Sequence, residues 1–124
     1  MIRIGVVGLG GMGRVHSNHY RHIPQVKLAA YDANPEALDA FCSNYSVTPC
    51  HSLEELFDHS DVVDVCLPTD LHYEIGLKAI AAGKHVLLEK PMARTTQECR
   101  ELLQAAREAK VQLAPGHVVR YFAD

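Results

Sequence analysis

The sequence predicts one α/β domain over residues 1–124, built on a doubly wound, six-stranded parallel sheet. Short apolar runs alternate with amphipathic segments along the whole chain, as expected for strands joined by helical crossovers. Most of these runs are continuously apolar, which is typical of parallel strands that are covered on both faces. Glycine, proline and helix-capping residues lie between the segments and mark where each element begins or ends.

The first two predicted strands flank a helix. Residues 2–7 are rich in β-branched side chains and stop at Gly8, which indicates a buried strand. A helix is expected over about 11–22, because Pro24 cannot continue it. Residues 27–31 form the next strand.

Two helix starts follow the second strand. Asn34-Pro35-Glu36 combines an N-cap residue, a proline for the first helical position and an acidic side chain at the positive end of the helix dipole. That helix extends to about residue 44 and precedes a short strand over 47–50. Ser52 and Glu55 then form a capping-box pattern, which predicts a brief helix.

The second half of the chain continues the alternation. Residues 62–67 form an apolar run that only Asp64 interrupts and that Pro68 ends. A helix over 69–82 is expected, with Thr69 as its N-cap residue. Gly83 is expected to follow the helix in the left-handed conformation.

The last two strands flank one more helix. Residues 85–88 are a short apolar run, which predicts the fifth strand. Thr95 and Glu98 repeat the capping-box pattern and open a helix that ends near Ala109. Residues 111–119 are the predicted sixth strand.

Composition and charge exclude several classes of protein. The 12 Lys and Arg against 15 Asp and Glu give a formal charge of −3, which is a poor match for nucleic acid. No apolar run approaches the ~20 residues of a membrane helix, and the N-terminal residues lack the layout of a signal peptide. The four cysteines form no Cys-x-x-Cys pair, so we expect free thiols and a cytoplasmic location.

A glycine-rich turn connects the first strand to its helix. Gly8-Leu9-Gly10-Gly11-Met12-Gly13 matches the Gly-x-Gly-x-x-Gly pattern. Gly8 permits a tight turn, Gly10 leaves space for a pyrophosphate, and Gly13 permits close packing of helix against strand. The amides at the start of the helix can then bind the anion. A turn without a ligand is the alternative, but this context favours a dinucleotide-binding, Rossmann-type fold.

Asp32 ends the second strand, 19 residues after Gly13, where an acidic side chain can accept hydrogen bonds from the adenosine ribose. The extra phosphate of NADP would bring about −1.5 to −2 charges to this carboxylate. At ~4 Å and an effective dielectric constant of ~20, each like-charge pair costs about 4 kcal/mol before screening. Ala33 and Asn34 offer no compensating cation. We therefore expect NAD rather than NADP; the alternative is that Asp32 is only a solvated charge.

Three further motifs carry a resemblance to a known family. Their sequences are Pro68-Thr69-Asp70-Leu71-His72 after the fourth strand, Glu89-Lys90-Pro91 after the fifth, and Gly116-His117-Val118-Val119-Arg120-Tyr121 at the end of the predicted sixth. Together with the glycine turn, they resemble the Gfo/Idh/MocA oxidoreductases, the glucose–fructose oxidoreductase and inositol dehydrogenase family, over essentially the whole chain. The third motif of that family ends in Phe, where this sequence has Tyr.

The resemblance implies an NAD-dependent dehydrogenase that transfers hydride between nicotinamide and a CH–OH group of a sugar, polyol or related small molecule. It makes Lys90 the candidate catalytic residue, which orients the substrate and shares acid–base work. It further implies that Glu89 holds Lys90 in place and that Pro91 fixes the backbone, with a cis bond as one option. The cofactor groove is expected to be lined by Leu67, Pro68, Thr69, His72, Glu89 and Lys90.

Structural alternatives stay open for several of these residues. Glu89 and Lys90 could form a solvent-exposed ion pair, and His72 could be a packed histidine at a helix start. His117 and Arg120 could shape the pocket or serve only the fold.

A row of histidines on the first predicted helix raises the question of a metal site. His16, His19 and His22 recur at every third residue. No carboxylate lies between residues 1 and 30, and a metal would compete with the packing face of the helix. We therefore expect no metal.

The resemblance also implies a second, C-terminal α+β domain that supplies the substrate pocket, further catalytic residues and most of the oligomer interface. We expect this domain to be absent from the chain, so that the chain binds dinucleotide but does not turn over substrate alone. The parent protein is expected to be a homo-oligomer with a small-molecule substrate and no nucleic-acid or membrane partner.

Two other functions fit parts of the pattern. A non-catalytic dinucleotide sensor would use the same turn but has little reason to keep Glu89-Lys90-Pro91. An S-adenosylmethionine-binding domain also uses a glycine turn and an acidic residue after the second strand. It predicts neither that motif nor a sixth parallel strand, so the dehydrogenase domain is the preferred prediction.

Overall fold

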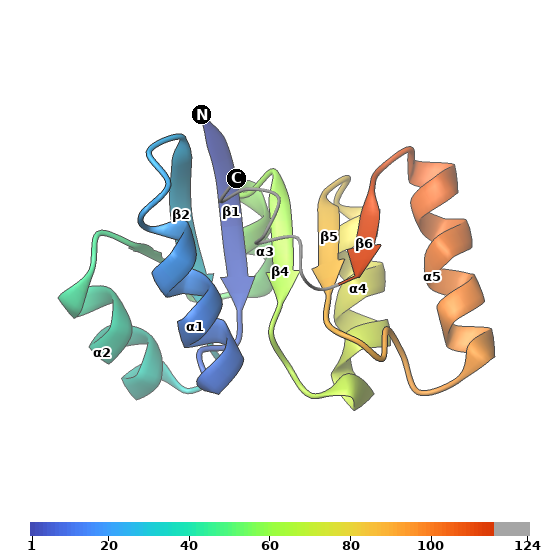
Figure 1. The fold of residues 1–124 in the computed structure, drawn as a ribbon, viewed down its shortest axis with the longest axis horizontal. Coiled ribbons are helices and arrows are strands. Elements are labelled where there is room, and N and C mark those ends of the chain that lie inside the picture. Colours follow the sequence, from blue (N-terminus) through green and yellow to red (C-terminus); the bar gives the residue numbers. More distant parts are fainter. Residues whose placement is uncertain (116–124) are drawn as a thin grey trace.

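The computed structural model describes residues 1–115, which form a six-stranded sheet with helices on both faces (Figure 1). The strands are β1 (Ile2–Val7), β2 (Val26–Tyr31), β3 (Thr48–Pro49), β4 (Val62–Val65), β5 (His85–Leu88) and β6 (Leu113–Pro115). Their order is β3-β2-β1-β4-β5-β6, and every neighbouring pair is parallel. The predicted α/β class and doubly wound, Rossmann-type sheet are confirmed.

Five helices connect the strands. They are α1 (Gly11–Tyr20), α2 (Pro35–Asn44), α3 (Leu53–Asp58), α4 (His72–Ala81) and α5 (Thr96–Ala109), with a short 3-10 turn, η1 (Thr69–Leu71), before α4. The chain builds the sheet outwards from β1 to β3 and then crosses back to β4. Because the crossovers keep one hand, α1 and α2 cover one face and the later helices cover the other (Figure 1).

Each face of the sheet has its own hydrophobic core. One core joins α1 and α2 to β1 and β2 through side chains such as Ile4, Tyr20 and Leu38. The other joins α3, α4 and α5 to the sheet and contains Val63 and Val65. Successive side chains of a strand point to opposite faces, so the residue between these two valines points towards α1.

The predicted helix starts have the expected side-chain caps at three positions. The side-chain oxygens of Asn34, Ser52 and Thr95 each accept a hydrogen bond at 3.0 Å from a backbone amide of the first turn. Gly83 is left-handed with φ of 78°, as predicted after α4. These local signals therefore operate as the sequence indicated.

The start of the helix after β4 differs from the prediction. Thr69 does not cap it, since neither η1 nor α4 has a side-chain cap within the described residues. The chain first forms the 3-10 turn, closed by the Leu71 amide donating to Pro68 O at 2.9 Å, and α4 begins only at His72. A backbone hydrogen bond therefore starts this helical segment in place of the predicted side-chain cap from Thr69.

The sixth strand begins at Leu113 and not at the predicted Val111. Lys110 is left-handed with φ of 60°, which lets the Val111 amide bond back to Ala106 O at 3.0 Å and close α5. That amide is therefore not available to begin a strand. Residues 116–119, the end of the predicted strand, lie outside the described residues, and other boundaries differ by one or two residues.

Two expectations from composition can be compared with the fold. All four cysteines are free thiols, as predicted. Within residues 1–115, none of the helices combines the length and apolar character needed to cross a membrane.

Candidate functional site

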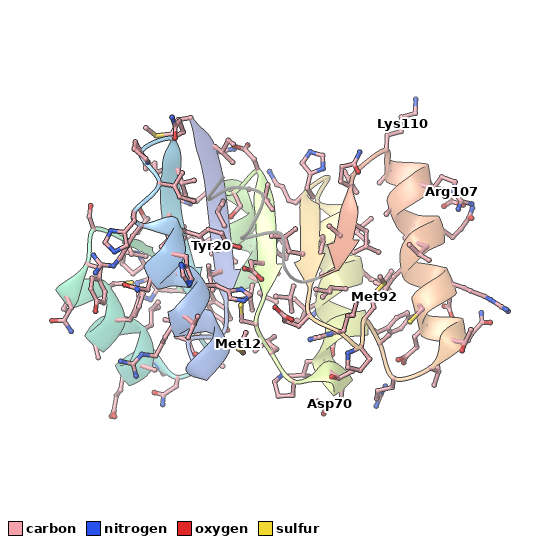
Figure 2. The ribbon with its side chains drawn as sticks, in the orientation of Figure 1. Met12, Tyr20, Asp70, Met92, Arg107 and Lys110 are labelled. Carbon is pink, nitrogen blue, oxygen red and sulfur yellow. The ribbon has the colours of Figure 1, made fainter. Side chains whose placement is uncertain are left out.

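The predicted site residues meet at the carboxyl edge of the sheet, at the arrowheads in Figure 1. Gly8 follows β1, Asp32 follows β2, and Glu89 follows β5. Because the strands are parallel, these loops share one edge, and the sheet order reverses there between β1 and β4. Ligands of open α/β sheets bind at such a reversal. Figure 2 shows Met12 and Asp70 at this edge and Lys110 at the opposite one.

Two glycines of the turn are required by the fold itself. Gly8 has φ of 96°, and a Cβ atom there would lie 2.6 Å from Cys66 O. A Cβ on Gly13 would lie 1.7 Å from Gly8 O, so any side chain would push α1 away from β1. Both distances are far below van der Waals contact, and the obstructing atoms are backbone.

Gly10 has a different environment. Among the described residues, no atom lies within 4 Å of the position of a Cβ on Gly10 or on Gly11. The first intrahelical bond of α1 runs from the Arg14 amide to Gly10 O, which leaves the preceding helical amides without a partner in the helix. Gly10, the N-cap residue, supplies no side-chain cap. Open space beside free amides at a helix N-terminus fits a diphosphate.

Asp32 is bound to the glycine turn. Its Oδ2 accepts a hydrogen bond from the Leu9 amide at 2.7 Å, and its Oδ1 accepts one from the Asn34 amide at 2.8 Å. A carboxylate has about four acceptor positions, so two remain for other donors. The side chain thus joins the turn after β1 to the start of α2 and keeps the capacity to bind ribose hydroxyls.

His72 occupies a structural position between two loops. Its side chain is buried, with Nε2 2.8 Å from Leu67 O and Nδ1 3.2 Å from Pro91 O and from Met92 O. Direct contact with a cofactor, which the sequence led us to expect, would require the ring to leave these partners. We therefore assign His72 to positioning the loops that follow β4 and β5. Leu67 and Thr69 of the first of these loops are partly exposed, and Pro68 is exposed.

The Glu-Lys-Pro motif lies just after β5, and the Lys90–Pro91 bond is cis. Lys90 is exposed and makes no ion pair within residues 1–115. The partner of Glu89 is His16, whose Nε2 lies 3.3 Å from Oε1. Within residues 1–115 no ion pair joins Glu89 to Lys90, so the alternative of a surface ion pair between them is wrong. That Glu89 holds Lys90 in place stays a prediction. The ring of His16, and not the Lys90 ammonium, is the neighbour of this carboxylate.

A buried polar cluster lies behind this motif, and the sequence did not predict it. Asp64 is 2% exposed, and its Oδ2 accepts a hydrogen bond from the Tyr20 hydroxyl at 2.5 Å and lies 2.7 Å from His16 Nδ1. The Cys66 thiol donates to Asp64 Oδ1 at 3.4 Å. The sequence does contain a signal for this cluster, which is the single acidic residue inside an apolar strand. A buried carboxylate requires hydrogen-bonding partners, so such a residue indicates a polar cluster around it.

The cluster changes how its members titrate. The hydrogen bond to Asp64 raises the pKa of His16 against the opposing effect of burial, and Glu89 adds to the increase. Burial, with the nearby Asp64 charge, raises the pKa of Tyr20 and of Cys66. Cys66 is therefore a neutral thiol and not a reactive thiolate.

The same atoms could be considered as metal ligands. The ligand atoms of His16, Asp64 and Cys66 all lie within 4.8 Å of one another. Nitrogen and oxygen ligands of tetrahedral zinc lie about 3.3 Å apart, given bond lengths of about 2.0–2.1 Å. The 2.7 Å between His16 Nδ1 and Asp64 Oδ2 is instead a hydrogen-bond distance. His19 is exposed on α1 and His22 is exposed beyond its end, so of the predicted histidine row only His16 is buried.

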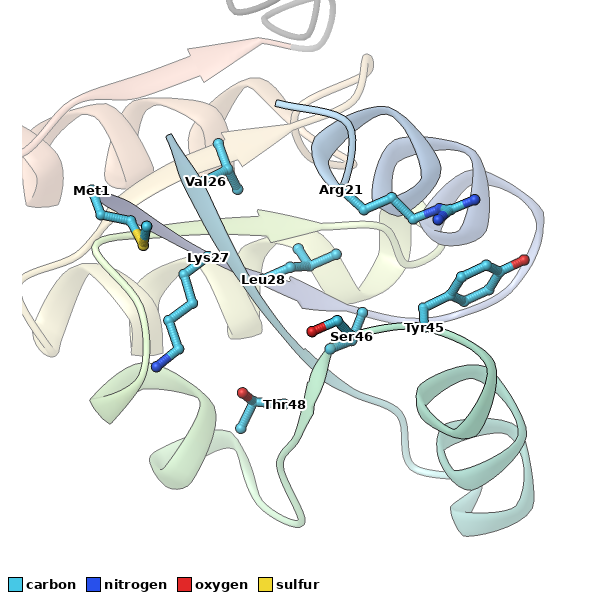
Figure 3. Close-up of a pocket in the computed structure, with 9 residues that line it drawn as sticks. Met1, Arg21, Val26, Lys27, Leu28, Tyr45, Ser46 and Thr48 are labelled. Carbon is cyan, nitrogen blue, oxygen red and sulfur yellow. The ribbon is translucent and has the colours of Figure 1, made fainter. Parts of the chain in front are cut away.

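A separate pocket lies at the amino end of β2, away from these residues (Figure 3). It is lined by Met1, Arg21, Val26, Lys27, Leu28, Tyr45, Ser46, Val47 and Thr48. The Arg21 guanidinium lies over the Tyr45 ring, 4.2 Å from its centroid. The pocket includes no predicted site residue. His117 and Arg120, the two pocket candidates of the last motif, lie outside the described residues.

A family model described as an oxidoreductase family with an NAD-binding Rossmann fold matches residues 2–117. The chain belongs to the Gfo/Idh/MocA family. Relatives within it include UDP-N-acetylglucosamine 3-dehydrogenase of Acidithiobacillus ferrooxidans, 33% identical over 96% of this chain, and glucose-6-phosphate 3-dehydrogenase of Bacillus subtilis, 32% identical over 99%. The match spans only 38% and 35% of the length of these two relatives.

Solved structures of the family have the same fold. The Acidithiobacillus ferrooxidans enzyme superposes with a TM-score of 0.88 at 30% identity, over 98% of this chain and 41% of its own. GenD2 of gentamicin A biosynthesis, in complex with NAD, gives 0.87 at 32% identity over 93% and 34%. Biliverdin reductase of Synechocystis, in complex with biliverdin and NADP+, gives 0.85 at 28% identity over 94% and 38%. These structures of the family thus include both an NAD and an NADP+ complex.

Proposed function

We propose that this Gfo/Idh/MocA domain binds NAD along the carboxyl edge of its sheet and serves hydride transfer to or from a CH–OH group of a sugar, polyol or related small molecule. The supporting observation is the open side of the glycine turn, where space at Gly10 adjoins free helix amides. The names of the relatives, which are sugar 3-dehydrogenases, support the substrate class.

Each part of the edge has a proposed role. The turn from Gly8 to Gly13 binds the diphosphate through its amides, and Asp32 accepts hydrogen bonds from the adenosine ribose. Leu67, Pro68 and Thr69 line the groove beyond the turn. When bound, NAD supplies the hydride chemistry, and the protein supplies orientation and electrostatics.

Lys90 is the proposed catalytic residue. Its side chain is exposed at the carboxyl edge, after the β5 strand end. An ammonium group there can donate a hydrogen bond to a substrate oxygen and exchange a proton with it. Glu89 contacts His16 and makes no ion pair with Lys90 within the described residues, so the Lys90 ammonium is free to meet a substrate.

We propose NAD rather than NADP as the preferred cofactor. Asp32 places a negative charge beside the turn, and both of its oxygens are already fixed by backbone amides. A 2′-phosphate brought to this carboxylate would meet a like charge that cannot turn away without breaking those bonds.

We also propose that turnover needs a second domain, which supplies the substrate pocket and the homo-oligomer interface. The limited share of each relative that this chain matches supports this division of labour.

The substitution G10A tests the proposed function. A Cβ on Gly10 meets no described atom, so the free energy of unfolding should change by less than about 1 kcal/mol. The methyl group would project into the proposed diphosphate position, and we expect at least a tenfold loss of NAD affinity by calorimetry, or about 1.4 kcal/mol. The control is N18A, an exposed position on the same helix. Unchanged NAD affinity in G10A, or no NAD binding by the unaltered chain, would contradict the proposal.

A further inference from the structure

We propose that His16 is a positioning residue, which in its protonated form fixes the Glu89–Lys90 end of β5 through a chain of two hydrogen bonds and an ion-pair contact. The inference deepens the proposed function, because it rests on Lys90 as the group that meets the substrate. The chain of contacts runs from Tyr20 through Asp64 and His16 to Glu89.

The chain begins with a carboxylate in the interior of the sheet. Asp64 lies within β4, and the alternation of side chains directs it towards α1. A charge buried this deeply is costly unless it is paired and hydrogen-bonded. The pairing groups are His16 and Tyr20, which lie four residues apart on the same face of α1 (Tyr20 is labelled in Figure 2).

His16 has a carboxylate oxygen on each side of its ring. Nδ1 lies 2.7 Å from Asp64 Oδ2, and Nε2 lies 3.3 Å from Glu89 Oε1. Ionised carboxylates only accept hydrogen bonds, so a carboxylate oxygen beside each ring nitrogen favours the form in which both nitrogens carry protons. The imidazolium therefore connects β4 to the segment after β5 through one side chain of α1.

The contact with Glu89 acts on Lys90 through the backbone. Glu89 directly precedes Lys90, and its carboxylate is directed inwards to α1 while Lys90 is exposed. Holding the glutamate inwards fixes the chain where the lysine side chain leaves it. It also keeps the carboxylate from competing for the ammonium. His16 thus supports the role that the resemblance gives to Glu89, which is to hold Lys90 in place.

The groups that face His16 come from three elements. Tyr20 lies on α1, the same helix as His16. Asp64 lies within β4, Cys66 directly follows that strand, and Glu89 follows β5. Burial raises the pKa of the Tyr20 hydroxyl and of the Cys66 thiol, so both stay neutral near pH 7. The two carboxylates are the charged neighbours, and both favour the protonated ring.

Nitrogen NMR of the ¹⁵N-labelled chain, without cofactor, tests the inference. We expect both ring nitrogens of His16 to be protonated near pH 7, and the Lys90 backbone amide to titrate with the midpoint of His16. In E89Q, the His16 midpoint should shift to lower pH, and the Lys90 amide should lose this dependence. H19Q removes an exposed histidine of the same helix and should leave the Lys90 profile unchanged.

Either of two results would overturn the inference. One is an unprotonated Nε2 on His16 in the unaltered chain near pH 7, which needs no variant to observe. The other is a Lys90 titration that persists in E89Q, a conservative change at a partly exposed side chain that the fold should tolerate. NAD affinity is measured separately. A chain that keeps the His16–Lys90 coupling but binds no NAD would contradict the proposed function and leave the positioning role intact.

Discussion

Asp32 illustrates how one side chain serves both the fold and the site. Its two oxygens hold the Leu9 and Asn34 amides, so it fixes the shape of the glycine turn before any ligand arrives. A carboxylate that is already oriented loses little conformational entropy when it binds ribose hydroxyls. The turn geometry and the proposed cofactor preference therefore depend on the same residue.

Replacement of Asp32 by Asn should reduce the preference for NAD over NADP. Asn has nearly the same size and keeps one acceptor for the turn, but it removes the negative charge. After screening, we expect the ratio of NAD to NADP affinity to fall by about tenfold. Tenfold is about 1.4 kcal/mol, which is roughly a third of the ~4 kcal/mol unscreened cost of one like-charge pair. Calorimetric titration of both cofactors measures the ratio, with D70N as a control for an exposed acid at the same edge. An unchanged ratio in D32N would contradict the role of the charge.

His16 should make stability depend on pH in a defined direction. The hydrogen bond to Asp64 raises its pKa above the ordinary 6.5 in the folded state, while the unfolded chain keeps the ordinary value. The stabilisation is therefore complete below about pH 6.5 and is lost as the pH rises through the raised pKa. Urea denaturation gives the free energy of unfolding at each pH. Between about pH 6 and 9, this free energy should decline more steeply with rising pH for the unaltered chain than for H16Q. H19Q should follow the unaltered chain; parallel curves for H16Q and the unaltered chain would refute the assignment.

At the scale of single elements, local capping accounts for most helix starts. Ser52 and Thr95 each accept a hydrogen bond from the amide of a glutamate three residues later. The glutamate side chains reach back to a backbone amide just before the cap, as Glu55 does to His51 N at 2.9 Å. Such reciprocal bonds satisfy amides that the helix itself leaves free.

The cap of α5 gives a stability prediction. T95A removes the acceptor for the Glu98 amide, and we expect the free energy of unfolding to fall by about 1 kcal/mol. The matched control is T96A, which changes the first residue of the helix and leaves the cap bond intact. Urea denaturation of both variants measures the difference. Equal stability of the two variants would show that the cap contributes nothing.

At the scale of the whole molecule, the strand order creates the site. β1 and β4 are neighbours although Val7, the last residue of β1, and Val62, the first residue of β4, are 55 positions apart in the sequence. The strand order reverses between β1 and β4, so the helices before and after this point lie on opposite faces of the sheet. The loops after β1, β2, β4 and β5 all lie at the same carboxyl edge. The proposed dinucleotide site follows from this arrangement and not from any single loop.

Cofactor binding should stabilise the entire domain by linkage. NAD at about 100 times its dissociation constant adds about 2.7 kcal/mol, which should raise Tm by roughly 8–10 °C for a domain of this size. At equal concentrations, NADP should raise Tm less, and S-adenosylmethionine should leave it unchanged. Thermal unfolding monitored by circular dichroism gives the comparison, with G10A as the control. A larger shift with S-adenosylmethionine than with NAD would favour the alternative class.

The elements were more predictable than the contacts between side chains. Most strands lie in dense apolar runs, and the starts of α2, α3 and α5 carry capping residues whose effect extends over one turn. The start of α4 was misjudged because a backbone 3-10 turn replaced the threonine cap. The partners of Glu89 and His72 were missed because they lie on other elements.

The residues alone predict the order of strands and helices, the glycine turn after β1 and the placement of Asp32 and Lys90 at strand ends. These depend on backbone preferences and on hydrogen bonds between near neighbours. The position of His16 between Asp64 and Glu89 arises only in the folded sheet. Asp64 is 48 residues from His16 in the chain, and the pairing depends on strand order and on the face of α1 that meets the sheet. Neither the strand order nor the buried face of α1 can be read from the residues near His16 or Asp64. Both depend on how the whole sheet is packed and buried.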